Sequence, residues 1–309
     1  MAIEIQRDKT KNVVVILASE RSKRPTISKN SRAKNKHSCP FDFGNEQMTP
    51  SSRLEIVTFK SKKWEVRAME NKFPAVSPFE KYVQNKEYTG AFGVHEVIVE
   101  TPNHNEQFED LSASQMQSVF EAYVNRFTEI SKIKGVKYVS LFKNHGQNAG
   151  ASIPHEHSQI IGLPFVPEMN VNEFQHSKNK SQCAYCKLAK EKASIIFENK
   201  FFSVVCPYIA RFGFECWVIP KKHKTDFSLF DTGERAAFME ALQETVRRVK
   251  RKTSDYNFSF HSSGKGGNVH FHVEIYPRQV APHVWAGLEL GTGVIISSTD
   301  KITALKTLR

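Results

Sequence analysis

With 309 residues the chain is long enough for two domains, and a hydrophobic content of 39%, with 23 Phe, can fill a substantial core. No stretch approaches the roughly 20 apolar residues of a membrane span, and the first ten residues lack a signal-peptide core, so we expect a cytoplasmic protein without a membrane partner. The net charge of +12 is spread over several short runs, which disfavours nucleic acid as the main partner and suits small phosphorylated substrates.

The first half predicts a strand, a helix and two more strands. Ser112 and Gln115 form a capping-box pattern ahead of apolar residues at three- and four-residue spacing, which is typical of a helix. His104 follows the first strand, and His155 opens the last one. The expected order is a strand at 94–99, a helix at 112–130, a strand at 138–142, a loop at 144–152 and a strand at 155–161.

The second half repeats this order. We expect a strand at 216–220, a helix face at 238–249 and a strand at 258–260, followed by a Gly-rich loop at 264–267 and a strand at 269–274. The first of the paired histidines follows the lone histidine by 51 positions in the first copy (His104 to His155) and by 47 in the second (His223 to His270). A cysteine motif precedes each copy. The repeat predicts domains at 1–166 and 183–309, joined by a polar linker at 167–182.

Two groups of residues are candidate metal ligands. The five cysteines are odd in number and irregularly spaced, which favours thiols and metal ligands over disulfides. The second-half group has the spacing of a structural zinc site and consists of Cys183, Cys186, His223 and His270. The alternatives are two reduced cysteines without a metal, or His261 as a ligand. The first-half group is Cys39, Asp42, His104 and His155. Its carboxylate shifts the preference toward other divalent ions, and Asp42 could instead cap a turn.

The paired histidines of the first half are candidate functional residues, one as a metal ligand and one as a nucleophile. On a strand, residues two apart share a face, so His155, His157 and Gln159 should face one site while Glu156 and Ser158 face away. His155 can then bind a metal while the neutral imidazole of His157 attacks phosphorus. Gln159 can donate to a phosphate oxygen, and the loop at 144–152 offers backbone N–H groups that could cradle a phosphate.

These segments resemble the galactose-1-phosphate uridylyltransferase family of the histidine-triad superfamily. The active-site signature is matched at 142–159, an arginine motif at 18–25 and a cysteine motif at 39–46. A nucleotide segment is matched at 71–75, a zinc histidine at 102–104 and a sugar-contacting strand at 287–293. The resemblance implies an α+β fold of two tandem half-barrels of antiparallel sheet flanked by helices. It also implies a homodimer that acts on a nucleotide sugar and a sugar 1-phosphate, with zinc as the cofactor.

The resemblance also implies a role for individual residues. His157 would carry the nucleotide covalently, and Gln159 and Ser152 would hold the transferred phosphate. The nucleotide and sugar would be bound by Arg21, Arg24, Asn71, Phe73, Asn144 and Glu289. Only the first copy has the glutamine, because Glu274 takes its place in the second copy, which is therefore expected to be structural.

Two features depart from the uridylyltransferase pattern. Glu156 stands where that family usually has proline, and it should face away from the chemistry. The Cys183–Cys186 motif and the segment at 71–75 are more similar to the ADP-glucose phosphorylase branch, which uses inorganic phosphate as acceptor. The alternative is therefore a nucleotide-sugar phosphorylase or hydrolase. A protein that only senses nucleotides would not need a nucleophile such as His157. The sequence also lacks the interleaved aromatic and basic residues that would indicate nucleic-acid binding.

Overall fold

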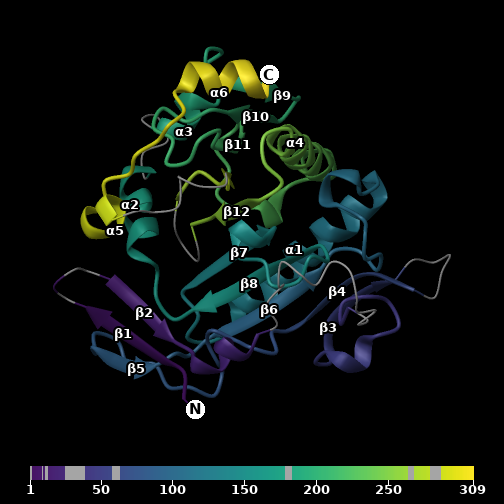
Figure 1. The fold of residues 1–309 in the computed structure, drawn as a ribbon, viewed down its shortest axis with the longest axis vertical. Helices are drawn as coiled ribbons and strands as arrows, with labels where there is room; N and C mark the ends of the chain where they lie inside the picture. Colours follow the sequence, from purple (N-terminus) through teal and green to yellow (C-terminus); the bar gives the residue numbers. More distant parts are fainter. Residues whose placement is uncertain are drawn as a thin grey trace. The chain divides into compact units, whose positions relative to one another are not determined.

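The computed structural model describes residues 2–8, 10, 13–24, 39–57, 63–177, 183–263, 268–278 and 287–309. Contacts divide the chain into two compact units (Figure 1). The first contains Met1–Glu106, Ser118–Leu141 and His155–Met169, and the second contains Gln107–Gln117, Phe142–Pro154 and Asn170–Arg309. The second unit thus includes two segments from the first half of the chain, and the domain boundaries expected from the repeat stay a prediction.

The first unit contains two sheets. The smaller has the order β2–β1–β5, and the larger runs β3–β4–β6–β8 and ends on the first part of β7. Its elements are β1 (Glu4–Asp8), β2 (Val13–Leu17), η1 (Ser19–Lys23), η2 (Glu46–Met48), β3 (Ser52–Val57), β4 (Trp64–Glu70), β5 (Tyr88–Gly90), β6 (Val94–Val99), most of α1 (Ala113–Lys132), β7 (Tyr138–His145) and β8 (His157–Leu163). The registers of β3–β4, β4–β6 and β6–β8 are antiparallel.

The second unit repeats that strand order, as β9–β10–β11–β13–β12, and β12 also pairs antiparallel with the end of β7. Its elements are η3 (Phe108–Asp110), η4 (Gln147–Ala149), most of α2 (Glu168–Ser177), α3 (Ala184–Leu188), β9 (Ile195–Glu198), β10 (Phe202–Val205), β11 (Cys216–Pro220), η6 (Phe227–Leu229), α4 (Thr232–Lys250), β12 (Tyr256–His261), β13 (His272–Pro277), α5 (Gly287–Thr292) and α6 (Lys301–Leu308). The paired histidines therefore stand at the start of β8 and of β13, which confirms the predicted duplication in the backbone.

Both long helices begin at a capping residue, and for α1 this is the predicted Ser112. The Ser112 hydroxyl accepts the N–H of Gln115 at 3.2 Å, and Asp231 and Glu234 form a reciprocal capping box at the start of α4. The predicted apolar faces are buried: Met116, Phe120, Tyr123, Phe127 and Ile130 on α1, and Phe238, Leu242, Val246 and Val249 on α4. Burial of these stripes against the sheets supplies most of the helices' stability, because propensity alone is weak.

Two segments have a local structure that the sequence analysis did not predict. The described part of the linker, residues 168–177, is helix α2, which follows Pro167 and has Glu168 in its first turn, both common at a helix start. Glu289 lies on the short helix α5 instead of a strand, and the N–H of Gly293, whose φ is +74°, bonds to the Glu289 carbonyl at 2.8 Å and ends that helix. Residues 178–182, the loop at 264–267 and residues 25–38 lie outside the described residues.

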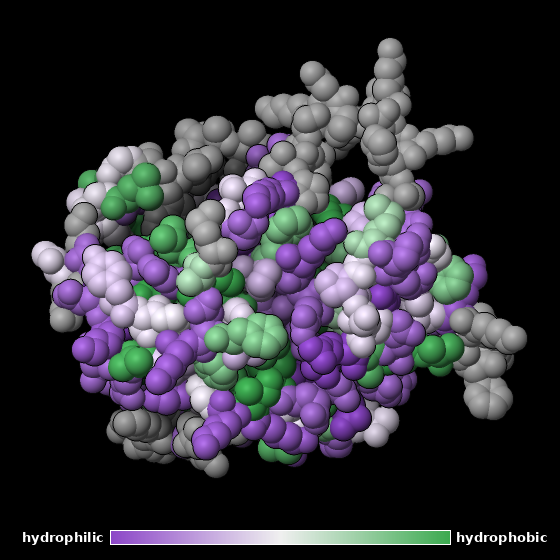
Figure 2. Space-filling view, turned by 90° about the horizontal axis from the view of Figure 1, so that it is seen from below, coloured by the Kyte–Doolittle hydropathy of each residue, from purple (hydrophilic) through white to green (hydrophobic). Residues whose placement is uncertain are grey.

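None of the described helices has the length and apolar character needed to cross a membrane. Figure 2 shows a face that is mainly hydrophilic, with small and separate hydrophobic areas. This distribution is ordinary for a globular surface, where single exposed apolar residues need no special explanation.

Candidate active site and metal-binding clusters

Strand β8 presents its residues alternately to two sides of the sheet, as the sequence predicts. His157 and Gln159 share one face, and both are mostly buried, with 7% and 8% of their surface exposed. Ser158 faces the opposite side, where its hydroxyl lies 2.8 Å from the Tyr123 hydroxyl of α1. The nucleophile candidate and the amide donor candidate therefore look in the same direction from one rigid strand.

The backbone fixes the tautomer of His157. Its Nδ1 atom lies 2.7 Å from the carbonyl oxygen of His155, and a carbonyl can only accept a hydrogen bond. Nδ1 therefore carries the proton, and the ring's lone pair is on Nε2. The Phe41 ring packs against this imidazole with 5.3 Å between ring centroids, which limits its rotation.

Gln159 belongs to a polar network with Asn71 and His95. The Gln159 Oε1 atom lies 3.0 Å from His95 Nε2 and 3.5 Å from Asn71 Nδ2. Asn71 in turn accepts the N–H of Phe73 through its Oδ1 atom at 2.9 Å. The structure thus brings the predicted residues Asn71, Phe73 and Gln159 together. It adds His95, which the sequence analysis missed although a histidine inside the apolar run 94–99 could have signalled it.

Arg21 and Arg24 lie near this network. Arg21 Nη1 donates to the carbonyl of Phe73 at 2.6 Å, and the charges of both arginines act on His95. Burial, and then the charge of Arg24, lower the pKa of Arg21. The Nε atom of Arg24 is buried and has no acceptor among the described residues. This pair of cations beside Gln159 is a suitable environment for phosphate groups.

A buried network supports β8 from the helix side. Glu100 accepts hydrogen bonds from the hydroxyls of Tyr123 and Ser158. Burial, and then the Glu100 charge, raise the pKa of Tyr123 well above its ordinary value. Glu156 is also buried, its carbonyl accepts the N–H of Glu100 at 3.1 Å, and its charge acts on Tyr123. Glu156 thus lies on the side away from His157, as predicted.

The loop from Asn144 to Ser152 belongs to the second unit and differs from the predicted phosphate cradle. The four consecutive N–H groups from 148 to 151 bond to Asp255 or to carbonyls of the loop itself, so they are not available as a cradle. A Cβ atom on Gly146, whose φ is +86°, would lie 2.3 Å from Asp255, which explains the glycine. Asn144 accepts from Asn257 at 2.8 Å, whereas the half-buried Ser152 has no hydrogen-bond partner among the described residues.

The first predicted metal group is assembled in the first unit. The ligand atoms of Cys39, Asp42, His104 and His155 all lie within 4.8 Å of one another. Asp42 Oδ1 lies 2.9 Å from His104 Nδ1 and 3.0 Å from His155 Nδ1. His155 Nε2 donates to the carbonyl of Thr101 at 2.7 Å, which leaves its Nδ1 lone pair directed into the cluster, as in many metal sites.

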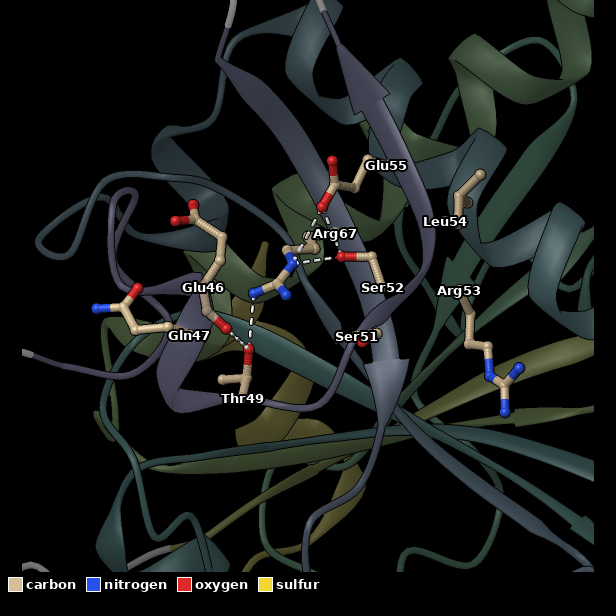
Figure 3. A pocket seen from close by; sticks show the side chains of 9 residues that line it. All are labelled: Glu46, Gln47, Thr49, Ser51, Ser52, Arg53, Leu54, Glu55 and Arg67. Atoms are coloured by element: carbon tan, nitrogen blue, oxygen red, sulfur yellow. Dashed lines mark hydrogen bonds and ion pairs between the residues drawn. The ribbon is translucent and has the colours of Figure 1, made fainter.

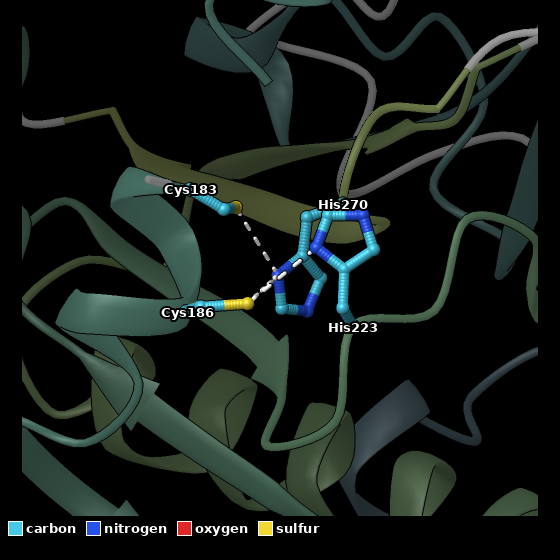
Figure 4. Close-up of side chains that lie close together, drawn as sticks. All are labelled: Cys183, Cys186, His223 and His270. Carbon is cyan, nitrogen blue, oxygen red and sulfur yellow. Dashed lines mark hydrogen bonds between the residues drawn. The ribbon is translucent and has the colours of Figure 1, made fainter. Parts of the chain in front are cut away.

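The second predicted group is assembled in the second unit (Figure 4). Cys183, Cys186, His223 and His270 converge there, with Cys186 Sγ 3.4 Å from His223 Nδ1 and 3.3 Å from His270 Nδ1. His270 Nε2 lies 2.9 Å from the carbonyl of Pro220, so this ring also presents Nδ1. Burial, and then His223, lower the pKa of His270 to about 3, so its imidazole is neutral as a ligand requires.

The second copy of the nucleophile position is built differently. His272 Nδ1 lies 2.9 Å from the His270 carbonyl, as in the first copy, but its Nε2 lies 3.2 Å from Glu173 and 3.5 Å from Glu274. Although burial acts the other way, these carboxylates raise the pKa of His272 to about 10. A protonated imidazole has no lone pair for attack, so His272 is not a candidate nucleophile.

His261 lies in this same cluster rather than beside Cys183, which overturns its expected role as an alternative ligand. Its Nδ1 is 3.0 Å from Glu173 Oε2, and Glu274 also pairs with Arg211. Ligand atoms of Glu173, His261, His272 and Glu274 lie within 4.8 Å, but the charges of Arg211 and protonated His272 already offset those of the two carboxylates. Glu173 comes from α2, in the segment predicted to be a linker, so its part in this cluster was missed.

Two pockets of the first unit lie elsewhere. One pocket, with a volume of about 620 Å³, surrounds Arg67, and Figure 3 shows the side chains that line it. The Arg67 guanidinium donates to Ser52 at 2.6 Å, Thr49 at 2.8 Å and the Pro50 carbonyl at 3.3 Å. Since the chain's own groups use these donors, Arg67 serves the structure. A cavity of about 520 Å³ is lined by residues of α1 as well as by Asn71 and His95. No residue of β8 lines this cavity, so neither His157 nor Gln159 belongs to it.

Comparison with known proteins agrees with this architecture. Residues 4–167 match the family model for the N-terminal domain of galactose-1-phosphate uridyl transferase. The chain is 30% identical to ADP-glucose phosphorylase of Arabidopsis thaliana, over 99% of this chain and 92% of that protein, and 28% identical to galactose-1-phosphate uridylyltransferase of Thermotoga maritima, over 96% and 94%.

A solved structure is similar along its whole length. The crystal structure of ADP-glucose phosphorylase from Arabidopsis thaliana with bound ADP-glucose aligns with a TM-score of 0.78 at 27% identity, covering 100% of this chain and 99% of that one. These findings confirm the predicted α+β fold of two antiparallel halves flanked by helices. The chain belongs to the galactose-1-phosphate uridylyltransferase family.

Proposed function

We propose that this chain is a nucleotidyltransferase that moves a nucleoside monophosphate from a nucleotide sugar to a phosphate acceptor through a covalent intermediate on His157. The observation that carries the proposal is the bond from His157 Nδ1 to the His155 carbonyl, which puts the lone pair on Nε2. Gln159 on the same face is the donor to the transferred phosphate, and Arg21 and Arg24 offset its negative charge.

The reaction has two displacements. In the first, His157 Nε2 attacks the α-phosphorus, a P–N bond forms, the bond from that phosphorus to the bridging oxygen breaks, and sugar 1-phosphate leaves. In the second, an oxygen of the acceptor phosphate attacks the same phosphorus, the P–N bond breaks, and His157 regains its neutral form. The ordered imidazole avoids the entropy cost of bringing a nucleophile from solution.

The acceptor distinguishes two candidate activities. A sugar 1-phosphate acceptor gives a uridylyltransferase-like exchange, and inorganic phosphate gives a phosphorylase. The second activity is favoured by the Cys183–Cys186 cluster and by the similarity to ADP-glucose phosphorylase along almost the whole chain. Roles for Ser152 and Asn144 at the phosphate and for Glu289 at the sugar remain proposals, as do the homodimer and the cytoplasmic location.

We propose zinc in the second-unit cluster, because two thiolates and two imidazoles are the donor set of structural zinc sites. Bound there, zinc would join α3 to His223, which follows β11, and to His270, which precedes β13, and so supply folding energy. The first-unit cluster would hold a divalent ion with a harder ligand, Asp42, and would fix the strand that carries His157.

The test combines wild type with either ADP-glucose or UDP-glucose and then offers one acceptor at a time. The proposal predicts adduct formation with at least one donor, and release of the nucleotide by glucose 1-phosphate, galactose 1-phosphate or inorganic phosphate. Release by inorganic phosphate alone identifies the phosphorylase, and release by sugar phosphates alone identifies the transferase. If His157→Ala turns over as fast as wild type, the proposal is wrong.

A further inference from the structure

His95 is a buried histidine that the mechanism above does not use. It lies on β6 with 4% of its surface exposed, and its Nδ1 atom is 3.0 Å from the backbone nitrogen of Ala75. A backbone N–H can only donate, so Nδ1 accepts and the ring proton is on Nε2. Burial, and then the charge of Arg21, lower the pKa of His95 to about 4, so the ring is neutral near pH 7.

This tautomer determines the orientation of the Gln159 side-chain amide. The Nε2–H of His95 points to a Gln159 atom 3.0 Å away, and only the carbonyl oxygen can accept it. Asn71 adds a second donor, because its Oδ1 is engaged by Phe73 and its Nδ2 lies 3.5 Å from the same Gln159 oxygen. The separation of 3.2 Å between Asn71 Nδ2 and His95 Nε2 reflects two donors converging on one oxygen.

We propose that His95 is a positioning residue that holds the Gln159 carboxamide with its NH₂ group, instead of its oxygen, toward the phosphoryl group on His157. The inference rests on the nucleotidyl transfer proposed above. A carbonyl oxygen in that place would repel the anionic phosphoryl oxygens, whereas an amide N–H stabilises the charge that develops there. His95 therefore acts on the reaction through Gln159, without touching the substrate.

Two substitutions separate the two hydrogen bonds of His95. His95→Asn keeps an oxygen near the Nδ1 position for the Ala75 N–H but has no atom that reaches Gln159. His95→Gln is the matched control, because its amide nitrogen reaches the Nε2 position and can donate to Gln159 while the Ala75 bond is lost. Both variants leave a polar side chain in the same buried space.

The measurement is the single-turnover rate of adduct formation with ADP-glucose and with UDP-glucose. We expect His95→Asn to slow the reaction by about tenfold or more, with the half-saturating concentration of nucleotide sugar changed less than about twofold, since removing an oriented donor costs up to about 10²–10³ in rate. His95→Gln should be faster than His95→Asn. In a Gln159→Ala background, His95→Asn should cause no further loss, because the effect passes through Gln159.

The inference is overturned if His95→Asn reacts at the wild-type rate, if it slows Gln159→Ala by the same factor, or if His95→Gln is the slower of the pair. Should either variant fail to fold, ¹⁵N NMR of histidine-labelled wild type decides, since a His95 ring protonated on Nδ1 contradicts the required tautomer. Failure of the proposed function is distinguishable, because wild type itself then forms no adduct with either nucleotide sugar.

Discussion

The Nδ1 atom of His157 lies 2.7 Å from the main-chain carbonyl of His155, so one histidine sets the tautomer of the other through its backbone. The His155 side chain meanwhile points its own Nδ1 to Asp42 at 3.0 Å. Replacing the His155 side chain keeps the hydrogen bond from His157 Nδ1 to the carbonyl at position 155, but it removes the candidate metal ligand. These two functions of His155 can therefore be separated by mutation.

His155→Ala is expected to remove the divalent ion of the first-unit cluster and lower the melting temperature, while His157 keeps a measurable rate of adduct formation. The reason is that the carbonyl at position 155 still holds His157 Nδ1. Metal content by mass spectrometry, melting temperature and adduct rate give the three readouts. His104→Ala is the control that removes a ligand of the same cluster outside β8, and it should lose the ion as well. Loss of all reaction in His155→Ala with full retention of the ion would contradict this reading.

Cys183→Ser is expected to reduce bound zinc by one ion per chain and to lower the melting temperature, because a thiolate ligand of the second-unit cluster is lost. Cys206→Ser is the matched control, since Cys206 is a buried thiol of the same unit outside the cluster. Zinc is measured by inductively coupled plasma mass spectrometry on wild type and both variants. Equal zinc loss in the two variants would show that the cluster does not bind the ion.

Phe238→Ala is expected to lower the free energy of unfolding by about 3–5 kcal/mol, because the ring is fully buried and its removal leaves a cavity. The ring packs against Phe202, Phe230, Phe260 and Phe271 at centroid distances of 5.5 to 5.7 Å. Leu229→Ala, at a position 71% exposed, should change stability by less than about 0.5 kcal/mol. Urea unfolding of the two variants tests this contrast, which disappears if Phe238 is not part of the core.

His95 also predicts a pH dependence of stability. Its pKa is about 4 in the folded chain and 6.5 as its ordinary value, so between these limits the unfolded chain binds a proton that the folded chain does not. The stability associated with neutral His95 is complete above about pH 6.5 and falls by about 3 kcal/mol as the pH drops to 4. The stability advantage of wild type over His95→Asn should therefore shrink from pH 7 to pH 4. A difference that does not change with pH contradicts the buried neutral ring.

Local patterns in the sequence predicted much of the fold. A capping pattern placed the start of α1, apolar spacing placed α1 and α4, and two-residue alternation placed His157 and Gln159 on one face, because these signals act within a few residues. The repeat grouped the two sets of candidate metal ligands that the structure brings together, since duplicated strands bring equivalent positions to equivalent places. These features depend on short-range geometry or on symmetry.

What the sequence could not predict depends on tertiary contacts. Nothing local indicates that Glu173 meets His272, or that Ala75 and Gln159 are joined through His95, because these residues are far apart in the chain. The loop before His155 looked like a phosphate cradle, but Asp255 and the loop's own carbonyls take its N–H groups. The competing acceptors come from the fold, so composition alone could not show them.

The most direct test of the central claim is to map the nucleotide adduct in wild type after brief mixing with ADP-glucose or UDP-glucose and no acceptor. Denaturation at neutral to alkaline pH, proteolysis and mass spectrometry locate the modified residue. The account predicts one nucleoside monophosphate per chain, on His157 and on neither His155 nor His272, and none in His157→Ala. An adduct on another residue, or rapid turnover with no adduct on His157, would contradict it.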